Sequence, residues 1–250
     1  MREIQAVLFD FDDTLQDREA AYRSYCAAFL AEFFPTLSEE EKARRIDEME
    51  SHIEGGYRKR EDYFPEMIAL WGWAEHPPLD FLCRHFNEHY GEHVALFPDA
   101  IPTIERLKAQ GYLLGIVSNG PSVLQNKKLD TAGIRGLFDV VAVSGDYGIH
   151  KPDRRLFDLA AQKLGVPNES CVFVGDHPVN DIKGALGADM QAVWMNYGTF
   201  AGQRTEGVPE ITRVSQVIGL LDQEKLPRSE KGRDTKIGRA AAGASPARCD

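Results

Sequence analysis

The fold is decided by residues 4–15, Ile-Gln-Ala-Val-Leu-Phe-Asp-Phe-Asp-Asp-Thr-Leu. The first half of this stretch is apolar and predicts a buried strand. The second half places three carboxylates, Asp10, Asp12 and Asp13, where that strand ends. Carboxylates this close repel one another and lose hydration when buried, so they need a compensating cation. Against the alternative of a solvated acidic turn, we expect a nucleophile and metal site at the C-terminal end of a central strand, where open parallel sheets place their chemistry.

The composition is that of a globular protein, with 43% hydrophobic and 27% charged residues. A chain of 250 residues can hold one large domain, or a core domain with a smaller inserted one. The formal net charge of −10 argues against nucleic acid or an anionic membrane surface as a partner. A small anionic substrate remains compatible with this charge, because a bound metal supplies positive charge locally.

The four cysteines, Cys26, Cys83, Cys171 and Cys249, are scattered and show no CxxC spacing. This pattern favours a reduced, cytoplasmic setting. The N-terminal residues do not form a basic-plus-apolar signal segment, and no apolar run approaches 18 residues. We therefore expect neither secretion nor membrane spanning.

Residues 16–95 show apolar positions at helical spacing and no strand pattern. Four helices are predicted, and Ser38 with Glu41 resembles a capping box at the start of the second. Their apolar positions include Tyr22, Tyr25, Cys26, Phe29, Leu30 and Phe33; Ile46, Met49 and Ile53; Tyr63, Phe64, Met67, Ile68 and Trp71; and Leu79, Leu82, Cys83, Phe86 and Tyr90. We expect this segment to be an inserted helical domain.

From residue 97 onward, predicted strands and helices alternate. The predicted strands are 113–117, 140–143, 171–174 and 191–195, and helices are expected around 101–107, before Gly133, over 153–164, after Asp181 and over 214–221. This alternation predicts a doubly wound parallel sheet of the α/β class. The expected domains are a core of residues 1–15 and 96–222, a helical cap of residues 16–95, and a disordered tail of residues 223–250 with almost no large apolar residues.

Four polar clusters fall at or near the ends of predicted strands. They are Asp10-Phe-Asp12-Asp-Thr14, Ser118-Asn119-Gly120, Lys151-Pro152-Asp153 and Gly175-Asp176-His-Pro-Val-Asn180-Asp181. In a doubly wound sheet the C-terminal ends of adjacent strands meet at one crevice, so we expect the clusters to be neighbours.

Together, in this order, the clusters resemble the four signature motifs of the haloacid dehalogenase-like superfamily, in its phosphatase branch. The resemblance covers residues 1–222, and the helical insertion after the first cluster is similar to the family's C1-type cap. It implies a Rossmann-like core, a helical cap and a phosphomonoester hydrolase.

Phosphoryl transfer from an alcohol needs a nucleophile, charge neutralisation and a proton for the leaving oxygen. Asp10 is placed to attack phosphorus and form an aspartyl-phosphate. Asp12 is placed to protonate the leaving oxygen and then to activate water. Because that role starts from a protonated carboxyl, we expect the crowded carboxylates to raise the pKa of Asp12.

The resemblance implies Mg²⁺, a hard cation that favours oxygen ligands. The implied ligands are Asp10, the backbone carbonyl of Asp12, and Asp176, with Asp181 binding directly or through water.

The resemblance also assigns the groups around the phosphate. Ser118 and the backbone amides near Asn119 and Gly120 are expected to hold phosphoryl oxygens. Lys151 is expected to neutralise the nucleophile and the transferring group, so that Asp10, Asp12, Ser118 and Lys151 form the catalytic set.

Several neighbouring residues have structural interpretations. Thr14 is expected to support the loop, Asp13 to be structural or solvent-facing, and Asp153 to cap a helix. His85, His89 and His93 recur at spacing i, i+4 and i+8, which two-histidine metal sites also use. No fourth ligand is apparent, so we expect the polar face of a helix there.

The leading hypothesis is therefore Mg²⁺-dependent hydrolysis of a small phosphomonoester by a monomer or homodimer. The preferred substrate is a nucleoside 5′-monophosphate, and the alternative is a phosphoglycolate or sugar phosphatase. Asp12 argues against a dehalogenase. The absence of a recognisable Schiff-base lysine motif argues against phosphonate cleavage. Asp13-Thr14 stands where the first motif of phosphomutases usually has Gly-Val, which argues against a phosphomutase. A non-catalytic binding protein on the same fold is the rival from a different class.

Overall fold

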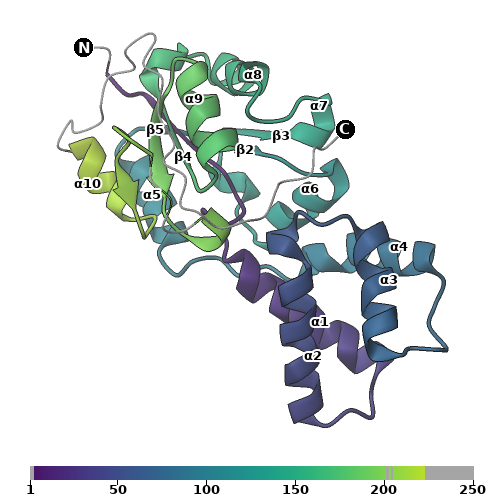
Figure 1. Cartoon of the computed structure of the whole chain (residues 1–250). Coiled ribbons are helices and arrows are strands. Elements are labelled where there is room, and N and C mark those ends of the chain that lie inside the picture. The colour runs from purple at the N-terminus through teal and green to yellow at the C-terminus, as the bar shows by residue number, and fades with distance from the viewer. Residues whose placement is uncertain (1–2, 201–202, 204, 223–250) are drawn as a thin grey trace.

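A six-stranded parallel sheet forms the centre of the protein (Figure 1). This computed structural model describes residues 3–200, 203 and 205–222, so the predicted tail lies outside the described residues. The strands are β1 (Ala6–Phe9), β2 (Leu113–Ser118), β3 (Val140–Val143), β4 (Cys171–Gly175), β5 (Gln191–Met195) and β6 (Glu210–Ile211), in the order β3-β2-β1-β4-β5-β6. The first strand thus lies inside the sheet, between β2 and β4, and its C-terminal end opens onto the centre of the crevice.

Helices cover both faces of the sheet, as the alternation of side chains along β1 requires. Val7 and Phe9 belong to one buried cluster, whereas Ala6 and Leu8 belong to the other. The first cluster includes residues of α5 (Ala100–Ala109), α6 (Ser122–Thr131) and α10 (Gln216–Asp222), and the second includes residues of α8 (Arg154–Leu164) and α9 (Gly184–Gly187). The predicted doubly wound α/β core is confirmed.

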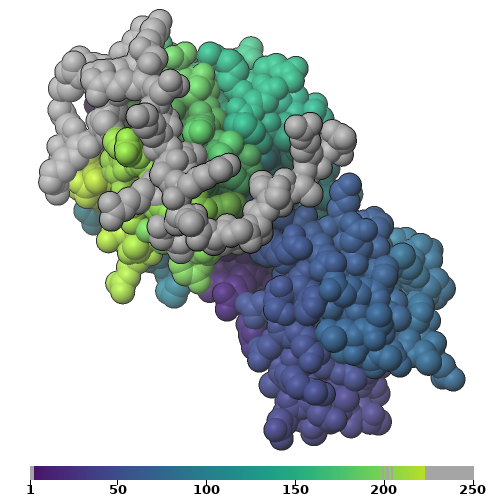
Figure 2. All heavy atoms as spheres, in the orientation of Figure 1, coloured from purple at the N-terminus to yellow at the C-terminus, as the bar shows by residue number. Residues whose placement is uncertain are grey.

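The four helices between β1 and α5 form a separate helical cap with its own buried cluster. They are α1 (Arg18–Phe33), α2 (Glu39–His52), α3 (Arg60–Trp71) and α4 (Leu79–His89), with short turns η1 (Glu54–Gly56) and η2 (Tyr90–Glu92). The capping box of Ser38 and Glu41 is present at the start of α2. Figure 2 shows the blue surface of these helices beside the green surface of the core. The inserted helical cap is confirmed, whereas its boundaries at residues 16 and 95 stay a prediction.

The structure adds elements that the sequence pattern does not reveal. They are β6, the short helix α7 (Ser144–Tyr147), and the turns η3 (Arg135–Leu137), η4 (Asn168–Ser170) and η6 (Gly198–Phe200). The helix expected after Asp181 begins earlier, at the π-helical turn η5 (Pro178–Lys183) that precedes α9. The reason is that His177 Nδ1 accepts hydrogen bonds from the amides of Val179 and Asn180, which caps the helix four residues before Asp181. None of the described helices combines the length and apolarity needed to cross a membrane.

Gly115 in β2 offers a test of the packing that supports β1. A Cβ atom at this position would lie 2.4 Å from Leu8 Cδ2 and 2.7 Å from Val140 Cγ1. We expect Gly115→Ala to lower the free energy of unfolding by about 1–3 kcal/mol, because these two buried side chains must shift. The matched control is Gly136→Ala, where an added Cβ meets nothing within 4 Å. Urea denaturation of both variants tests the idea, and equal stabilities would contradict it.

Candidate active site

Asp10 leaves β1 at the centre of the crevice. Its amide continues the ladder by donating to the carbonyl of Val174 at 2.9 Å. The next side chain, Phe11, is fully buried in the core, so Asp10 and Asp12 are free to face the crevice. The chain then turns back, since the amide of Leu15 donates to the carbonyl of Phe11 at 2.9 Å. This tight turn keeps the acidic residues together at the strand end.

Lys151 joins the first and fourth sequence clusters. Its Nζ forms ion pairs with Asp10 Oδ1 at 2.8 Å and with Asp181 Oδ1 at 2.7 Å, and the residue is only 3% exposed. Asn119 fixes its backbone, because Asn119 Nδ2 donates to the Lys151 carbonyl at 3.0 Å and the Lys151 amide donates to Asn119 Oδ1 at 2.8 Å. Three of the four clusters therefore meet at one ammonium group.

Asp176 and Asp181 complete a carboxylate cluster with Asp10. Ligand oxygens of the three residues lie within 4.8 Å of one another, and all three side chains are buried. Asp176 Oδ2 has no hydrogen-bond partner among the described residues, while the Asp176 carbonyl accepts a hydrogen bond from Trp194 Nε1 at 2.8 Å. Gly175 is needed here, since a Cβ on it would lie 2.5 Å from Asp181 Oδ2.

Helix α6 holds the Asp12 carboxylate. Lys128 Nζ lies 2.9 Å from Oδ1 and 3.2 Å from Oδ2, and Gln125 Nε2 donates to Oδ2 at 2.9 Å. Gln16 Nε2 also donates to Oδ1, at 2.5 Å. The sequence analysis missed Lys128 and Gln125, although the signal was available: they are polar residues three apart on the helix that follows Ser118-Asn119-Gly120. Both are buried, at 3% and 2% exposed.

The pKa values of the two proposed catalytic carboxyls shift in opposite directions. Burial raises the pKa of Asp10 to about 6, although Lys151 opposes the shift. Burial also acts to raise the pKa of Asp12, but the charges of Lys128 and Arg18 outweigh it and lower that pKa to about 2. The expectation of a raised Asp12 pKa is therefore wrong for this arrangement, because the expected repulsion among carboxylates is outweighed by a cation from α6.

The second cluster is already engaged in hydrogen bonds. Ser118 Oγ is buried and accepts from Gln125 Nε2 at 2.8 Å, so one amide bridges Ser118 and Asp12. The Gly120 amide donates to Ser144 Oγ at 3.0 Å. Ser118 thus lies beside the acidic site as predicted from the strand order, whereas the Gly120 amide already has an acceptor.

Asp13 is buried and structural. It adopts φ of 55° and accepts hydrogen bonds from the amide of Arg18 at 3.2 Å and from Arg18 Nε at 3.0 Å. Gly198 lets a neighbouring loop approach, since a Cβ there would lie 2.6 Å from Asp13 Oδ2. Thr14 is also buried, in keeping with a supporting role in the loop. Asp153 caps α8 by accepting from the amide of Arg155.

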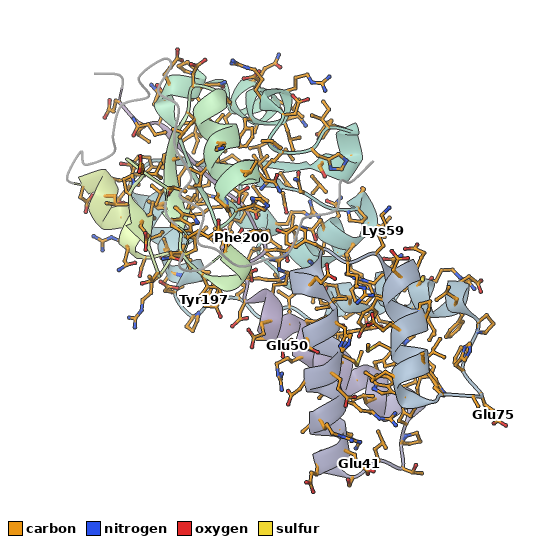
Figure 3. All side chains as sticks on the ribbon, viewed as in Figure 1. Glu41, Glu50, Lys59, Glu75, Tyr197 and Phe200 are labelled. Atoms are coloured by element: carbon orange, nitrogen blue, oxygen red, sulfur yellow. The ribbon has the colours of Figure 1, made fainter. Side chains whose placement is uncertain are left out.

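A cleft of about 1090 Å³ is lined by residues of the helical cap and of the core, including Asp10, Asp12 and Lys151. Figure 3 labels three residues that line it: Glu50 and Lys59 from the cap, and Tyr197 from the loop after β5. At its catalytic end, five carboxylates face three cations. The carboxylates are Asp10, Asp12, Asp13, Asp176 and Asp181, and the cations are Arg18, Lys128 and Lys151. The formal charge there is −5 + 3 = −2, which a divalent cation would balance.

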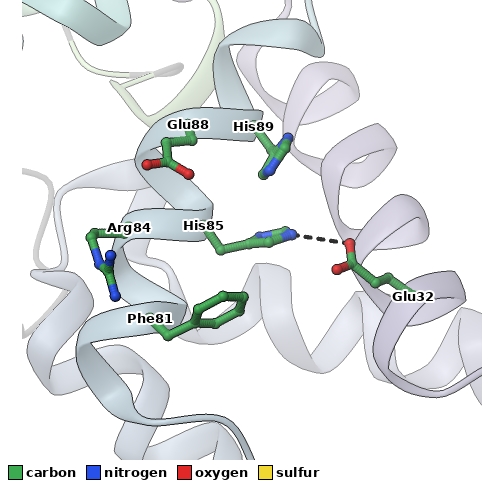
Figure 4. Close-up of a pocket in the computed structure, with 6 residues that line it drawn as sticks. All are labelled: Glu32, Phe81, Arg84, His85, Glu88 and His89. Carbon is green, nitrogen blue, oxygen red and sulfur yellow. Dashed lines mark hydrogen bonds and ion pairs between the residues drawn. The ribbon is translucent and has the colours of Figure 1, made fainter.

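His85 and His89 of α4, and His93 directly after η2, do not form a comparable cluster. His85 Nε2 lies 3.1 Å from Glu32 Oε2 (Figure 4). Its Nδ1 lies 3.2 Å from the hydroxyl of Tyr25. His89 pairs with Glu92, and His93 Nδ1 contacts Ser24 Oγ. His85 is only 6% exposed, so the expectation of a polar helix face is wrong for it. Within the described residues, the candidate metal cluster is the one formed by Asp10, Asp176 and Asp181.

Comparison with known families agrees with this geometry. Residues 7–195 match the family described as haloacid dehalogenase-like hydrolase. The chain belongs to this family.

Relatives of this chain are named as phosphatases of several different substrates. A glyceraldehyde 3-phosphate phosphatase of Methanopyrus kandleri is 34% identical, over 87% of this chain and 97% of that protein. A phosphoglycolate phosphatase of Escherichia coli is 28% identical, over 91% and 95% of the two chains. A pyrimidine 5′-nucleotidase of the same bacterium is 26% identical, over 86% and 95%. Among solved structures, a putative haloacid dehalogenase-like hydrolase from Bacillus subtilis bound to magnesium matches with a TM-score of 0.64 and 25% identity, over 88% and 100%.

The donor set suits a hard divalent cation. Asp10, Asp176 and Asp181 offer carboxylate oxygens, which Mg²⁺ prefers, and the described residues place no thiol or imidazole in this cluster. The unpartnered Oδ2 of Asp176 is a buried acceptor that such an ion would satisfy. The residues present therefore fit the ion that the family resemblance implies.

The shifted pKa values predict opposite stability effects for two substitutions. The pKa of Asp10 is raised from its ordinary value of 3.8 to about 6 in the folded protein, so ionisation of Asp10 opposes folding as the pH rises through this range. In EDTA at pH 8, we expect Asp10→Asn to raise the free energy of unfolding by about 1–3 kcal/mol, with the gain disappearing near pH 4.

Asp12→Asn is the matched control for this measurement. Because the folded pKa of Asp12 is lowered to about 2, its carboxylate stabilises the fold above pH 4, and this contribution is lost as the pH falls toward 2. We therefore expect Asp12→Asn to destabilise the protein at pH 8. Urea denaturation at both pH values gives the signs, and two shifts in the same direction would refute the assignment.

Proposed function

We propose that the protein hydrolyses small phosphomonoesters in a Mg²⁺-dependent reaction that passes through an aspartyl-phosphate on Asp10. One observation carries this proposal: Lys151 Nζ forms ion pairs with both Asp10 and Asp181, while Asp176 completes the carboxylate cluster around them. The nucleophile thus has a cation beside it and two further carboxylates within metal-binding distance. Two relatives that are named as phosphatases align with 87% and 91% of this chain, which supports this chemistry.

The chain supplies a nucleophile and charge neutralisation. The Asp10 carboxylate attacks phosphorus, and the ammonium of Lys151 offsets negative charge on both the carboxylate and the transferring group. Ser118 Oγ lies beside the site and binds a phosphoryl oxygen. Asp10, the Asp12 carbonyl, Asp176 and Asp181 would hold Mg²⁺, which would supply further positive charge to the phosphoryl oxygens.

Asp12 serves as the acid and then the base. Its pKa of about 2 in the ligand-free site means that it is ionised at neutral pH. A phosphomonoester brings negative charge next to this carboxylate, which raises its pKa and favours uptake of a proton. The protonated carboxyl then protonates the leaving oxygen, and the carboxylate that results removes a proton from the water that attacks the aspartyl-phosphate. This carboxyl also distinguishes the proposal from dehalogenation, which does not need it.

The substrate we propose is a short phosphorylated sugar or acid. The relatives named glyceraldehyde 3-phosphate phosphatase and phosphoglycolate phosphatase support this choice. They favour the alternative over the nucleoside 5′-monophosphate that the sequence analysis preferred, although one relative is named as a nucleotidase. The helical cap covers the cleft and limits the size of the molecule that reaches Asp10.

Trapping the covalent intermediate tests the mechanism. Asp12→Asn is expected to lower kcat by about 10²–10⁴-fold, because both proton transfers lose their group, while still forming some phospho-enzyme. Intact-protein mass spectrometry after acid quenching should detect one added phosphoryl group on this variant. Asp10→Asn is the control, and it should show neither turnover nor the added mass.

Metal dependence is tested by measuring hydrolysis of a generic phosphomonoester. EDTA should abolish hydrolysis of p-nitrophenyl phosphate by the wild type, and added Mg²⁺ should restore it. Hydrolysis that persists both in EDTA and in Asp10→Asn would refute the proposal.

A further inference from the structure

The cations that line the cleft differ in one respect, namely whether a carboxylate neutralises them. Lys151 pairs with Asp10 and Asp181, Lys128 with Asp12, Arg18 with Asp13, and Arg58 with Glu66. Lys59 is exposed to solvent, which screens its charge. Arg60 is the exception among the partly buried cations of the described cleft, since no carboxylate of the described residues pairs with it.

Arg60 is the first residue of α3 and lies inside the cap, on the wall of the cleft. Its guanidinium stacks over the ring of Phe86 at 4.1 Å and donates to the backbone carbonyls of Arg58 and Gly56. Nε is buried without an acceptor in the described residues. Burial acts to lower its pKa, and the groups that oppose this are tyrosine hydroxyls, not carboxylates. An arginine stays charged in proteins, so the cap carries a partly buried positive charge that no carboxylate of the described residues neutralises.

A row of aromatic rings connects Arg60 with the catalytic end of the cleft. Lys128, which holds Asp12, lies over the ring of Tyr90 at 4.8 Å. Tyr90 stacks on Phe86 with ring centroids 4.8 Å apart, and Phe86 in turn carries Arg60. The two cations therefore lie along one wall, with Lys128 near the reacting carboxylates and Arg60 further into the cap.

We propose that Arg60 binds a second anionic group of the substrate, a carboxylate or a second phosphate, while the phosphoryl group that is transferred lies at Asp10. This inference rests on the proposed phosphatase function and narrows its substrate to small phosphorylated acids or bisphosphates. The planar fork of N–H donors in a guanidinium matches the oxygens of either group. A partly buried charge that no carboxylate neutralises favours a ligand that supplies the opposite charge, and it disfavours substrates with a neutral tail.

Two matched pairs of substrates test the proposal. In each pair a carboxylate replaces a hydroxymethyl group: 2-phosphoglycolate against 2-hydroxyethyl phosphate, and 3-phosphoglycerate against glycerol 3-phosphate. Ethane-1,2-diol bisphosphate, compared with 2-hydroxyethyl phosphate, tests whether a second phosphate is preferred. We expect the wild type to prefer the anionic member of at least one pair, or the bisphosphate over 2-hydroxyethyl phosphate, by tenfold or more in kcat/KM. A preference within the carboxylate pairs identifies a carboxylate as the second anionic group, and a preference for the bisphosphate identifies a second phosphate.

Arg60→Met keeps the stem over Phe86 and removes the charge. It should lower kcat/KM for the preferred anionic substrate by tenfold or more, mainly through KM, and change that for the neutral member by less than threefold. Arg60→Lys should recover part of the preference. Arg58→Met is the matched control, because Arg58 lines the same cleft but already pairs with Glu66, and it should leave the preference unchanged.

The possible failures are distinguishable. Equal losses on both members of a pair in Arg60→Met and Arg60→Lys, or a wild type without any preference for a second anion, would overturn the role of Arg60. If the wild type hydrolyses none of these compounds and no p-nitrophenyl phosphate, the proposed phosphatase function fails instead. Thermal melting checks that each variant is folded, and Arg60→Lys carries the test if Arg60→Met does not fold.

Discussion

The ammonium of Lys151 between Asp10 and Asp181 is the interaction on which the rest of the site depends. Two buried carboxylates from separate segments could not face one another without it, since like charges at this distance repel strongly in a desolvated site. The surrounding structure fixes this lysine through its backbone, by a reciprocal pair of hydrogen bonds with Asn119. The loops after β2, β3 and β4 are thereby tied to the end of β1.

Even with Lys151, the catalytic end of the cleft keeps more negative than positive charge. Burial raises the pKa of Asp10 to about 6, so its ionised form opposes folding at neutral pH. The protein tolerates this cost because β1 is flanked on both sides by parallel strands and both of its faces are packed. A stable core thus supports a carboxyl group with a raised pKa, and such shifted pKa values are common at functional sites.

The sequence was sufficient for the parallel sheet, the inserted helices and the convergence of the four clusters, because each depends on local patterns and on one topological rule. It was insufficient for the surroundings of Asp12. Lys128 is 116 residues away from Asp12, and its contact depends on how α6 packs. The same limitation explains the wrong pKa direction for Asp12 and the unexpected burial of His85. Charge pairs between distant segments depend on distances that periodicity does not contain.

Helix α6 connects Asp12, the proposed catalytic acid, with the cap. Lys128 on this helix binds Asp12 and lies over Tyr90, while the adjacent Lys127 pairs with Glu92 of the cap at 2.7 Å. Because Tyr90 and Glu92 belong to the same short turn, a displacement of that turn changes the surroundings of Lys128 and hence those of Asp12. The proposed proton donor and the cap wall of the cleft are therefore not independent parts. One helix, α6, thus contacts both the cap and the Asp12 carboxylate.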